Sequence, residues 1–286
     1  MGVDPSVTAF LLSPLALALL GLCVGSFLNV VIHRLPLMLE QGWKRESSEL
    51  LGIEFKDASP ALTLSRPRSR CPSCGHAITW WENLPVVSYA LLRGRCSACK
   101  APISVRYPVV EVLTGILFVL VGWRFGAQPV ALLWCGFAAA LVALAGIDWD
   151  TTLLPDNMTL PLLWAGLAAS ALGWTIHLPD AVWGAAGGYL SLWSVYWLFK
   201  LATGKEGMGY GDFKLLAALG AWLGVKMLLP IVLAASLIGV VVGVVMRLNA
   251  ALREGRYVPF GPFLAGAGIV VLLAGERRVL GWLGWA

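Results

Sequence analysis

Residues 7–32 read VTAFLLSPLALALLGLCVGSFLNVVI, 26 positions without one charged side chain. About 20 apolar residues are enough for a helix to cross the hydrocarbon core of a bilayer. A cleaved secretory signal has basic residues ahead of a shorter apolar run, but Met1–Asp4 contain none and the first basic residue is Arg34. We therefore expect residues 1–32 to be a retained first transmembrane helix, with the N-terminus outside the cytoplasm.

The rest of the chain has the same apolar character. Hydrophobic residues make up 58% of it, charged residues only 13%, and the mean hydropathy is +0.78. Soluble domains carry roughly 25% charged residues. We predict an all-α polytopic membrane protein with about eight transmembrane helices, near residues 8–32, 107–123, 129–147, 157–176, 180–199, 212–225, 228–247 and 260–276.

The basic residues indicate topology rather than nucleic-acid binding, although the net charge is +5. If the polar segment 33–106 is cytoplasmic, 17 of the 21 Lys and Arg residues fall in or beside cytoplasmic loops. Such a bias marks the cytoplasmic side of a membrane protein. Residues 33–106 therefore form a polar cytoplasmic insert between the first two spans.

Two CxxC pairs lie in this insert, Cys71 with Cys74 and Cys96 with Cys99. Four thiolates from two tight knuckles match the tetrahedral coordination of structural zinc. Two disulfides are the alternative, but a reducing cytoplasmic face argues against them. A redox-active CxxC is a weaker alternative, because paired knuckles are unusual for it. We predict a zinc site, with metal binding supplying much of the folding free energy of the insert.

Two carboxylates lie at the cytoplasmic edges of different spans. Asp148 directly follows an apolar run, and Asp212 follows Gly209 and Gly211 at the start of another. A carboxylate at membrane depth is costly and is therefore a functional candidate. Two carboxylates brought together share a proton, as in aspartic proteases, and the glycines would let an extended peptide approach.

The neighbouring charged residues have simpler interpretations. Asp150 reads as a solvated loop carboxylate, Asp156 and Asn157 as helix caps, and Lys214 as a lysine that extends to the membrane interface. For the pair itself, a cation relay in a transporter remains an alternative. So does a membrane scaffold in which the zinc knuckles dock a partner and the two carboxylates are dispensable.

An ordered set of motifs resembles the GxGD aspartic proteases, and most closely the type IV prepilin leader peptidases. The GxGD run is Gly209–Asp212, and Asp148 lies eight residues before the Asp of Leu154-Pro155-Asp156, as in that family. Four further segments agree with the family and extend the resemblance over about residues 20–270: Gly25–Pro36, Trp81–Tyr89, Arg106–Glu111 and Pro259–Ala265.

The resemblance implies an enzyme with two activities. It would cleave prepilin and pseudopilin leaders after a glycine, with Asp148 and Asp212 as the catalytic pair and Gly209 and Gly211 in the loop supporting them. It would then methylate the new N-terminus with S-adenosylmethionine. For that cofactor we suggest residues of the insert and its junctions, which are Glu82, Asn83, Gly94 and Glu111.

The expected organisation follows from the same resemblance. Residues 1–32 are the first transmembrane helix, 33–106 the zinc-knuckle insert associated with methyl transfer, and 107–286 the transmembrane aspartic peptidase bundle. The expected location is a bacterial inner membrane, with the active site facing the cytoplasm. The expected partners are membrane lipid and prepilin or pseudopilin substrates, with no nucleic acid.

Overall fold

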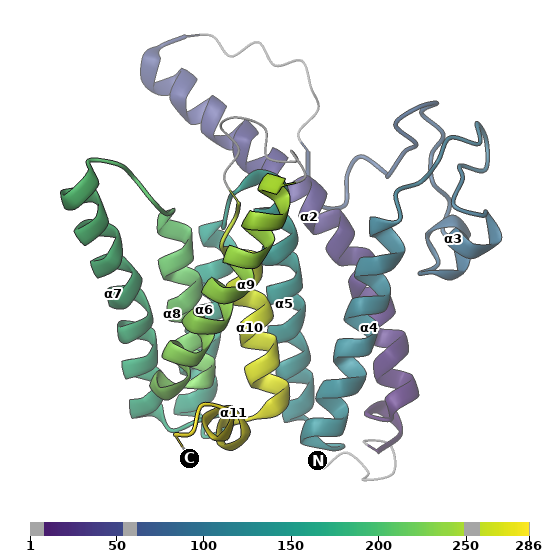
Figure 1. Ribbon diagram of the computed structural model, residues 1–286. Coiled ribbons are helices and arrows are strands. Elements are labelled where there is room, and N and C mark those ends of the chain that lie inside the picture. The colour runs from purple at the N-terminus through teal and green to yellow at the C-terminus, as the bar shows by residue number, and fades with distance from the viewer. Residues whose placement is uncertain (1–8, 54–61, 249–257, 286) are drawn as a thin grey trace. The chain divides into compact units, whose positions relative to one another are not determined.

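The computed structural model describes residues 9–53, 62–248 and 258–285, and these residues form helices and loops without a β-strand (Figure 1). Four helical segments are long and apolar enough to cross a membrane by length and composition: α2 (Pro14–Leu51), α4 (Arg106–Phe125), α5 (Val130–Thr151) and Val225–Leu248, which comprises η2 and α9 (Leu228–Leu248). The described residues thus form a helical structure with four candidate spans.

The other four predicted ranges coincide with helices α6 (Asp156–Ala171), α7 (Leu178–Thr203), α8 (Tyr210–Leu223) and α10 (Gly261–Ala274). Of these, α6 has 16 residues and α8 and α10 have 14 each, fewer than the ~20 that a full crossing needs. The number of eight spans therefore stays a prediction.

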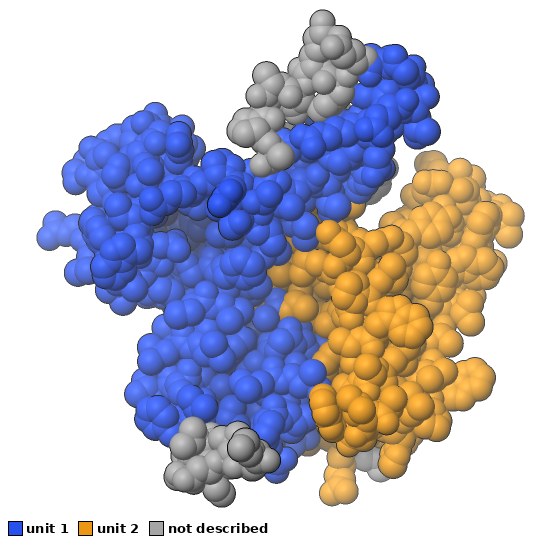
Figure 2. All heavy atoms as spheres, turned by 180° about the vertical axis from the view of Figure 1, so that it is seen from behind, with its two compact units in different colours: residues 1–139 blue, residues 140–286 orange. Residues whose placement is uncertain are grey.

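The chain divides into two compact units, residues 1–139 and 140–286, with the boundary inside α5 (Figure 2). In the first unit α2 packs along α4. A Cβ built on Gly21 would lie 2.7 Å from the Cα of Gly115, so the two backbones approach closely because both positions lack a side chain. The buried amide of Asn29 donates to the carbonyl of Tyr107 at 3.0 Å, which ties the two helices together where the insert leaves and rejoins them.

Helix α2 does not end near Ile32, where we expected the first transmembrane helix to end, but continues to Leu51 (Figure 1). Residues 37–51 are polar but rich in Leu, Glu, Gln, Lys and Arg, which favour helix. The helix ends at Gly52, which takes the left-handed conformation with φ of 63°.

The second half of the insert, residues 62–105, contains only short elements, η1 (Trp81–Asn83) and α3 (Val87–Leu91). Two isolated bridges, Arg70 with Ala77 and Arg95 with Pro102, close a turn around each CxxC pair. Each pair therefore lies on its own knuckle.

The second unit is built around α8, which packs against α6, α7 and α10. Ten of its 14 residues are buried. A Cβ on Gly184 of α7 would clash with the backbone carbonyl of Gly220 on α8, so these helices touch through their backbones. On the α6 side, the Trp222 indole N–H donates to the carbonyl of Leu162 at 2.8 Å.

Candidate functional site

Asp148 and Asp212 come together in the second unit, on α5 and α8. Their exposed fractions are only 5% and 8%, and the two carboxylates are close enough to interact electrostatically. They are separated by 64 positions in the sequence. The structure therefore brings together the two residues that the motif spacing singled out.

Each carboxylate group lies next to the N-terminal end of a helix, where the backbone dipole is positive. For Asp148 this helix is α10, and for Asp212 it is α8. The Oδ2 atom of Asp148 accepts the backbone N–H of Gly261, the first residue of α10, at 2.9 Å. Asp212 lies in the first turn of α8. These helix ends offset part of the cost of burying an ionised carboxylate at this site.

Gly261 is a site residue to which the sequence analysis gave no role. A Cβ at this position would lie 2.6 Å from Oδ2 of Asp148, so only glycine leaves room for the carboxylate. The available signal was a Gly-Pro pair opening an apolar run after a polar segment. Its partner lies 113 residues earlier, which no local pattern indicates.

Leu154, from the turn after α5, packs between two of the glycines that border the site. A Cβ on Gly211 would lie 2.6 Å from the Cβ of Leu154, and one on Gly261 would lie 3.1 Å from its Cδ1. Gly209 occupies the cap position of α8 in an extended conformation. The glycines thus let the turn carrying Leu154 seat directly against the start of α8.

Aromatic rings pack against the first turn of α8 on the side that faces α7. Phe213 is fully buried and packs edge-on against Tyr189 and Tyr196 of α7, with ring centroids 5.9 and 5.7 Å apart. Tyr210 lies 5.4 Å from the same ring. The residue after Asp212 is therefore anchored on α7.

The two charged residues read as a helix cap and an interfacial lysine instead form an ion pair. Pro155 takes the cap position of α6, and Asp156 is the first helical residue. Both carboxylate oxygens of Asp156 accept from Nζ of Lys214, at 2.6 and 2.7 Å. Asp150 is exposed as expected, but it lies in the last turn of α5 rather than in a loop.

The loop before the GxGD run folds back on α7. Nζ of Lys200 donates to Glu206 at 2.8 Å, and this hydrogen bond lowers the pKa of the Glu206 carboxyl. Gly207 leaves room for the ring of Phe199, which a Cβ would approach to 2.9 Å. Glu206 therefore has a cationic partner within the chain.

The four cysteines of the insert form one cluster. Their Sγ atoms lie within 4.8 Å of one another, and those of Cys71 and Cys99 are 3.8 Å apart. Zinc–sulfur bonds of about 2.3 Å in a tetrahedron require sulfur atoms about 3.8 Å apart, so the spacing fits zinc. The backbone N–H groups of Cys74 and Ser73 lower the pKa of Cys71, while burial and the neighbouring sulfur atoms raise that of Cys74, so Cys71 loses its proton before Cys74.

Glu82, which we suggested as a cofactor ligand, links the two knuckles. Its side chain is 6% exposed and accepts hydrogen bonds from the backbone N–H and hydroxyl of Thr79, at 2.7 and 2.6 Å, and from the hydroxyl of Ser97. The Ser97 hydroxyl is the main cause that lowers the pKa of Glu82 to about 2, and Thr79 adds to it. Thr79 follows the first CxxC and Ser97 lies within the second, so one carboxylate joins them.

The other suggested cofactor residues lie on three elements of the insert and its junction. Glu111 is buried on α4, and its Oε2 accepts the backbone N–H of Val86 at 2.8 Å. Gly94 is buried in a turn with φ of +66° against the ring of Tyr89, and Asn83 is exposed on η1. Both carboxylates of the suggested set therefore have partners inside the first unit.

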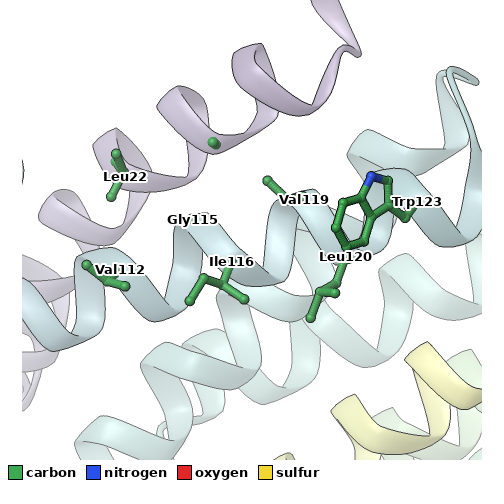
Figure 3. A pocket seen from close by; sticks show the side chains of 8 residues that line it. Leu22, Val112, Gly115, Ile116, Val119, Leu120 and Trp123 are labelled. Carbon is green, nitrogen blue, oxygen red and sulfur yellow. The ribbon is translucent and has the colours of Figure 1, made fainter.

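A groove on the first unit runs between α2 and α4, lined among others by Leu22, Ile116 and Trp123 (Figure 3). No ionisable side chain lines it. It therefore lacks the groups for acid–base chemistry that the carboxylate pair provides.

Two family models match the chain. The bacterial peptidase A24 N-terminal domain matches residues 19–125, and the type IV leader peptidase family matches residues 135–244. These ranges cover most of the first and second units, respectively.

Several relatives are similar over nearly the whole chain. A prepilin leader peptidase/N-methyltransferase of Stutzerimonas stutzeri is 51% identical over 278 residues, which is 96% of each protein. One of Pseudomonas putida is 54% identical over 90% of this chain and 89% of the relative, and one of Neisseria gonorrhoeae is 48% identical over 98% of both. No solved structure matches the chain significantly.

Proposed function

Because this chain belongs to the type IV leader peptidase family, we propose that it is a prepilin leader peptidase and N-methyltransferase. It removes the leader of type IV prepilins and then methylates the new N-terminal residue. Cleavage follows a glycine on the cytoplasmic side of the membrane, and pseudopilins of type II secretion are substrates as well.

The observation that carries the peptidase assignment is the buried pair Asp148 and Asp212, which lies beside the turn whose Leu154 packs on glycines. We assign these two as the catalytic residues. One carboxylate takes a proton from water, and the other, protonated, donates a hydrogen bond to the scissile carbonyl. The water oxygen bonds to the carbonyl carbon, the C–N bond breaks, and the leaving amine takes up a proton.

The glycines around the pair have different roles. A helical substrate has its carbonyls in hydrogen bonds, so the cleavage segment has to be extended when it reaches the carboxylates. Gly209, the cap residue of α8, leaves open space for such a segment, whereas Gly211, the second residue of α8, supports Asp212 by making room for Leu154. Gly261 completes this group by holding Asp148 through its backbone N–H.

We assign methyl transfer to the insert, residues 33–106. Cys71, Cys74, Cys96 and Cys99 hold a structural zinc ion, and the fitting sulfur spacing supports this. S-adenosylmethionine, when bound, would supply the methyl group for the new N-terminal amine. Around this site Asn83 and Gly94 are the candidates for contact, while Glu82 and Glu111 shape it through their internal hydrogen bonds.

The proposed organisation keeps the predicted segments. Residues 1–32 are the first transmembrane helix and 107–286 the peptidase bundle, in a bacterial inner membrane with the N-terminus outside. The excess of Lys and Arg in the proposed cytoplasmic loops supports this orientation.

A purified sample incubated with a prepilin and S-adenosylmethionine labelled in its methyl group tests the proposal. We expect a shortened pilin, seen by mass spectrometry, and label on its new N-terminus. The two products are scored separately, because a chain that cleaves without labelling contradicts only the methyl-transfer half. No shortening at all would overturn the peptidase assignment.

A further inference from the structure

We infer that the ion pair between Asp156 and Lys214 is a positioning device for the peptidase reaction, setting the direction in which Asp212 points. The inference rests on the proposed peptidase function and assigns to two further residues a role in that reaction. Neither side chain is proposed to touch the substrate.

Lys214 lies on a different side of α8 from Asp212. Two residues on a helix are separated by about 200° around its axis, since one turn takes 3.6 residues. Lys214 faces Asp156 of α6, so its pairing does not neutralise Asp212 directly. It instead fixes the rotation of the first turn of α8 about its own axis.

The first turn of α8 needs such a constraint because the backbone at its start is flexible. Gly209 and Gly211 precede Asp212, and glycines give the backbone wide conformational freedom. The α7 side of the turn is held by the apolar contacts of Phe213 with Tyr189 and Tyr196. On the α6 side, the polar contact that holds the turn is the Lys214 ion pair.

The ion pair also links two short chain segments, one following Asp148 and the other following Asp212. Asp156 lies eight positions after Asp148 in the sequence, and Lys214 lies two positions after Asp212. The ion pair, with oxygens at 2.6 and 2.7 Å from Nζ, bridges the remaining gap. Separation and orientation of the two carboxylates therefore depend on this contact as well as on Leu154.

Lys214 is the fifth residue of α8 and is partly exposed. Its side chain is 26% exposed and that of Asp156 is 57% exposed. An exposed pair contributes little to global stability, so its loss should leave the fold intact.

The test compares kcat and KM for prepilin cleavage by the purified full-length chain. For Asp156→Asn and for Lys214→Gln we expect kcat to fall about 10- to 100-fold, because misplacing a reacting group by about 1 Å has effects of this size. KM should stay unchanged, and so should methylation of a pilin that has already been cut. The double variant with Asp156→Lys and Lys214→Asp should recover kcat to within a few-fold of the original.

Lys226→Gln is the matched control, because Lys226 forms another ion pair of the second unit, with Glu276 at 3.3 Å, and should leave kcat unchanged. Single variants with full kcat would overturn the inference, and so would a charge swap as slow as the single variants. A wild-type chain that cuts no prepilin would instead contradict the proposed function.

Discussion

The insert and α8, the helix that carries Asp212, differ in how many of their residues are buried. Between residues 62 and 105 only Gly94 and Cys96 are buried, whereas ten of the 14 residues of α8 are buried. The insert segment 62–106 also carries seven basic residues and one acidic residue, Glu82. The insert thus has almost no apolar core, and α8 is almost entirely core.

This difference teaches that the two regions depend on different sources of stability. A segment without a core needs metal or dense polar contacts to hold one conformation. A helix packed on three neighbours is held by close contact and tolerates no added volume. Damage to one region should therefore leave the other working, and the following predictions test that separation.

The largest effect is expected from removing the cysteines. Cys71→Ser combined with Cys96→Ser should abolish zinc binding, whose free energy in such sites is about 10 kcal/mol or more, and unfold the knuckles. Metal analysis should give about one zinc per chain before the change and none after it. Cys135→Ser, outside the quartet, should keep the zinc.

The cysteine variant should still cleave prepilin while losing methyl transfer. If cleavage fell together with methylation, the two regions would not be independent in the way that their construction suggests.

The next effect concerns the carboxylate pair. Asp148→Asn and Asp212→Asn should each lower prepilin cleavage about 10³-fold, because acid–base catalysis needs both groups. Zinc content and methylation of a pilin cut beforehand should not change. Asp180→Asn, an exposed carboxylate in the first turn of α7, is the control and should cleave normally.

A smaller effect is expected where α7 and α8 touch through their backbones. Gly184→Ala should destabilise the second unit by about 1–3 kcal/mol, because the added methyl group would overlap the carbonyl of Gly220. The loss of stability is measured as a lower temperature at which heating abolishes cleavage activity. Gly266→Ala, where an added Cβ meets nothing within 4 Å, should unfold at the original temperature, and equal losses in both would contradict the packing argument.

The smallest effect concerns Glu82. Glu82→Gln should weaken the link between the knuckles by about 1–2 kcal/mol, seen as faster loss of zinc to a chelator. Because hydrogen bonds lower the pKa of Glu82 to about 2 from its ordinary value of 4.5, its contribution is complete above pH 4.5 and is lost as the pH falls towards 2. Glu276→Gln, at an exposed ion pair, should leave zinc loss unaltered.

Much of the helical framework could be predicted from apolar runs. The predicted range 107–123 lies within α4 (Arg106–Phe125), and 228–247 lies within α9 (Leu228–Leu248). The continuation of α2 to Leu51 was missed, because a polar helix outside the membrane leaves no hydropathy signal. The predicted range 212–225 is as short as α8, which has 14 residues, so the apolar run indicated the length of this helix, and its assignment as a span stays a prediction.

The site could be predicted only as far as local motifs reach. Spacing identified Asp148 and Asp212, but the hydrogen bond from Gly261 and the ion pair between Asp156 and Lys214 connect residues distant in sequence. Glu82 was suggested only as a possible cofactor contact of the insert. Its partners, Thr79 and Ser97, depend on how the knuckles fold together, which composition does not specify.

The hydrogen bond between Asn29 and Tyr107 has a consequence for how this chain can change. Between these residues the chain makes a loop of almost 80 positions, yet its two ends are already held within 3.0 Å by the packed pair α2 and α4. The entropy of closing a loop grows only slowly with its length, so lengthening or trimming the insert should change stability little. Deleting it down to a short linker should leave the helix pair standing, which makes the insert a module that can be gained or lost without redesign of the membrane helices.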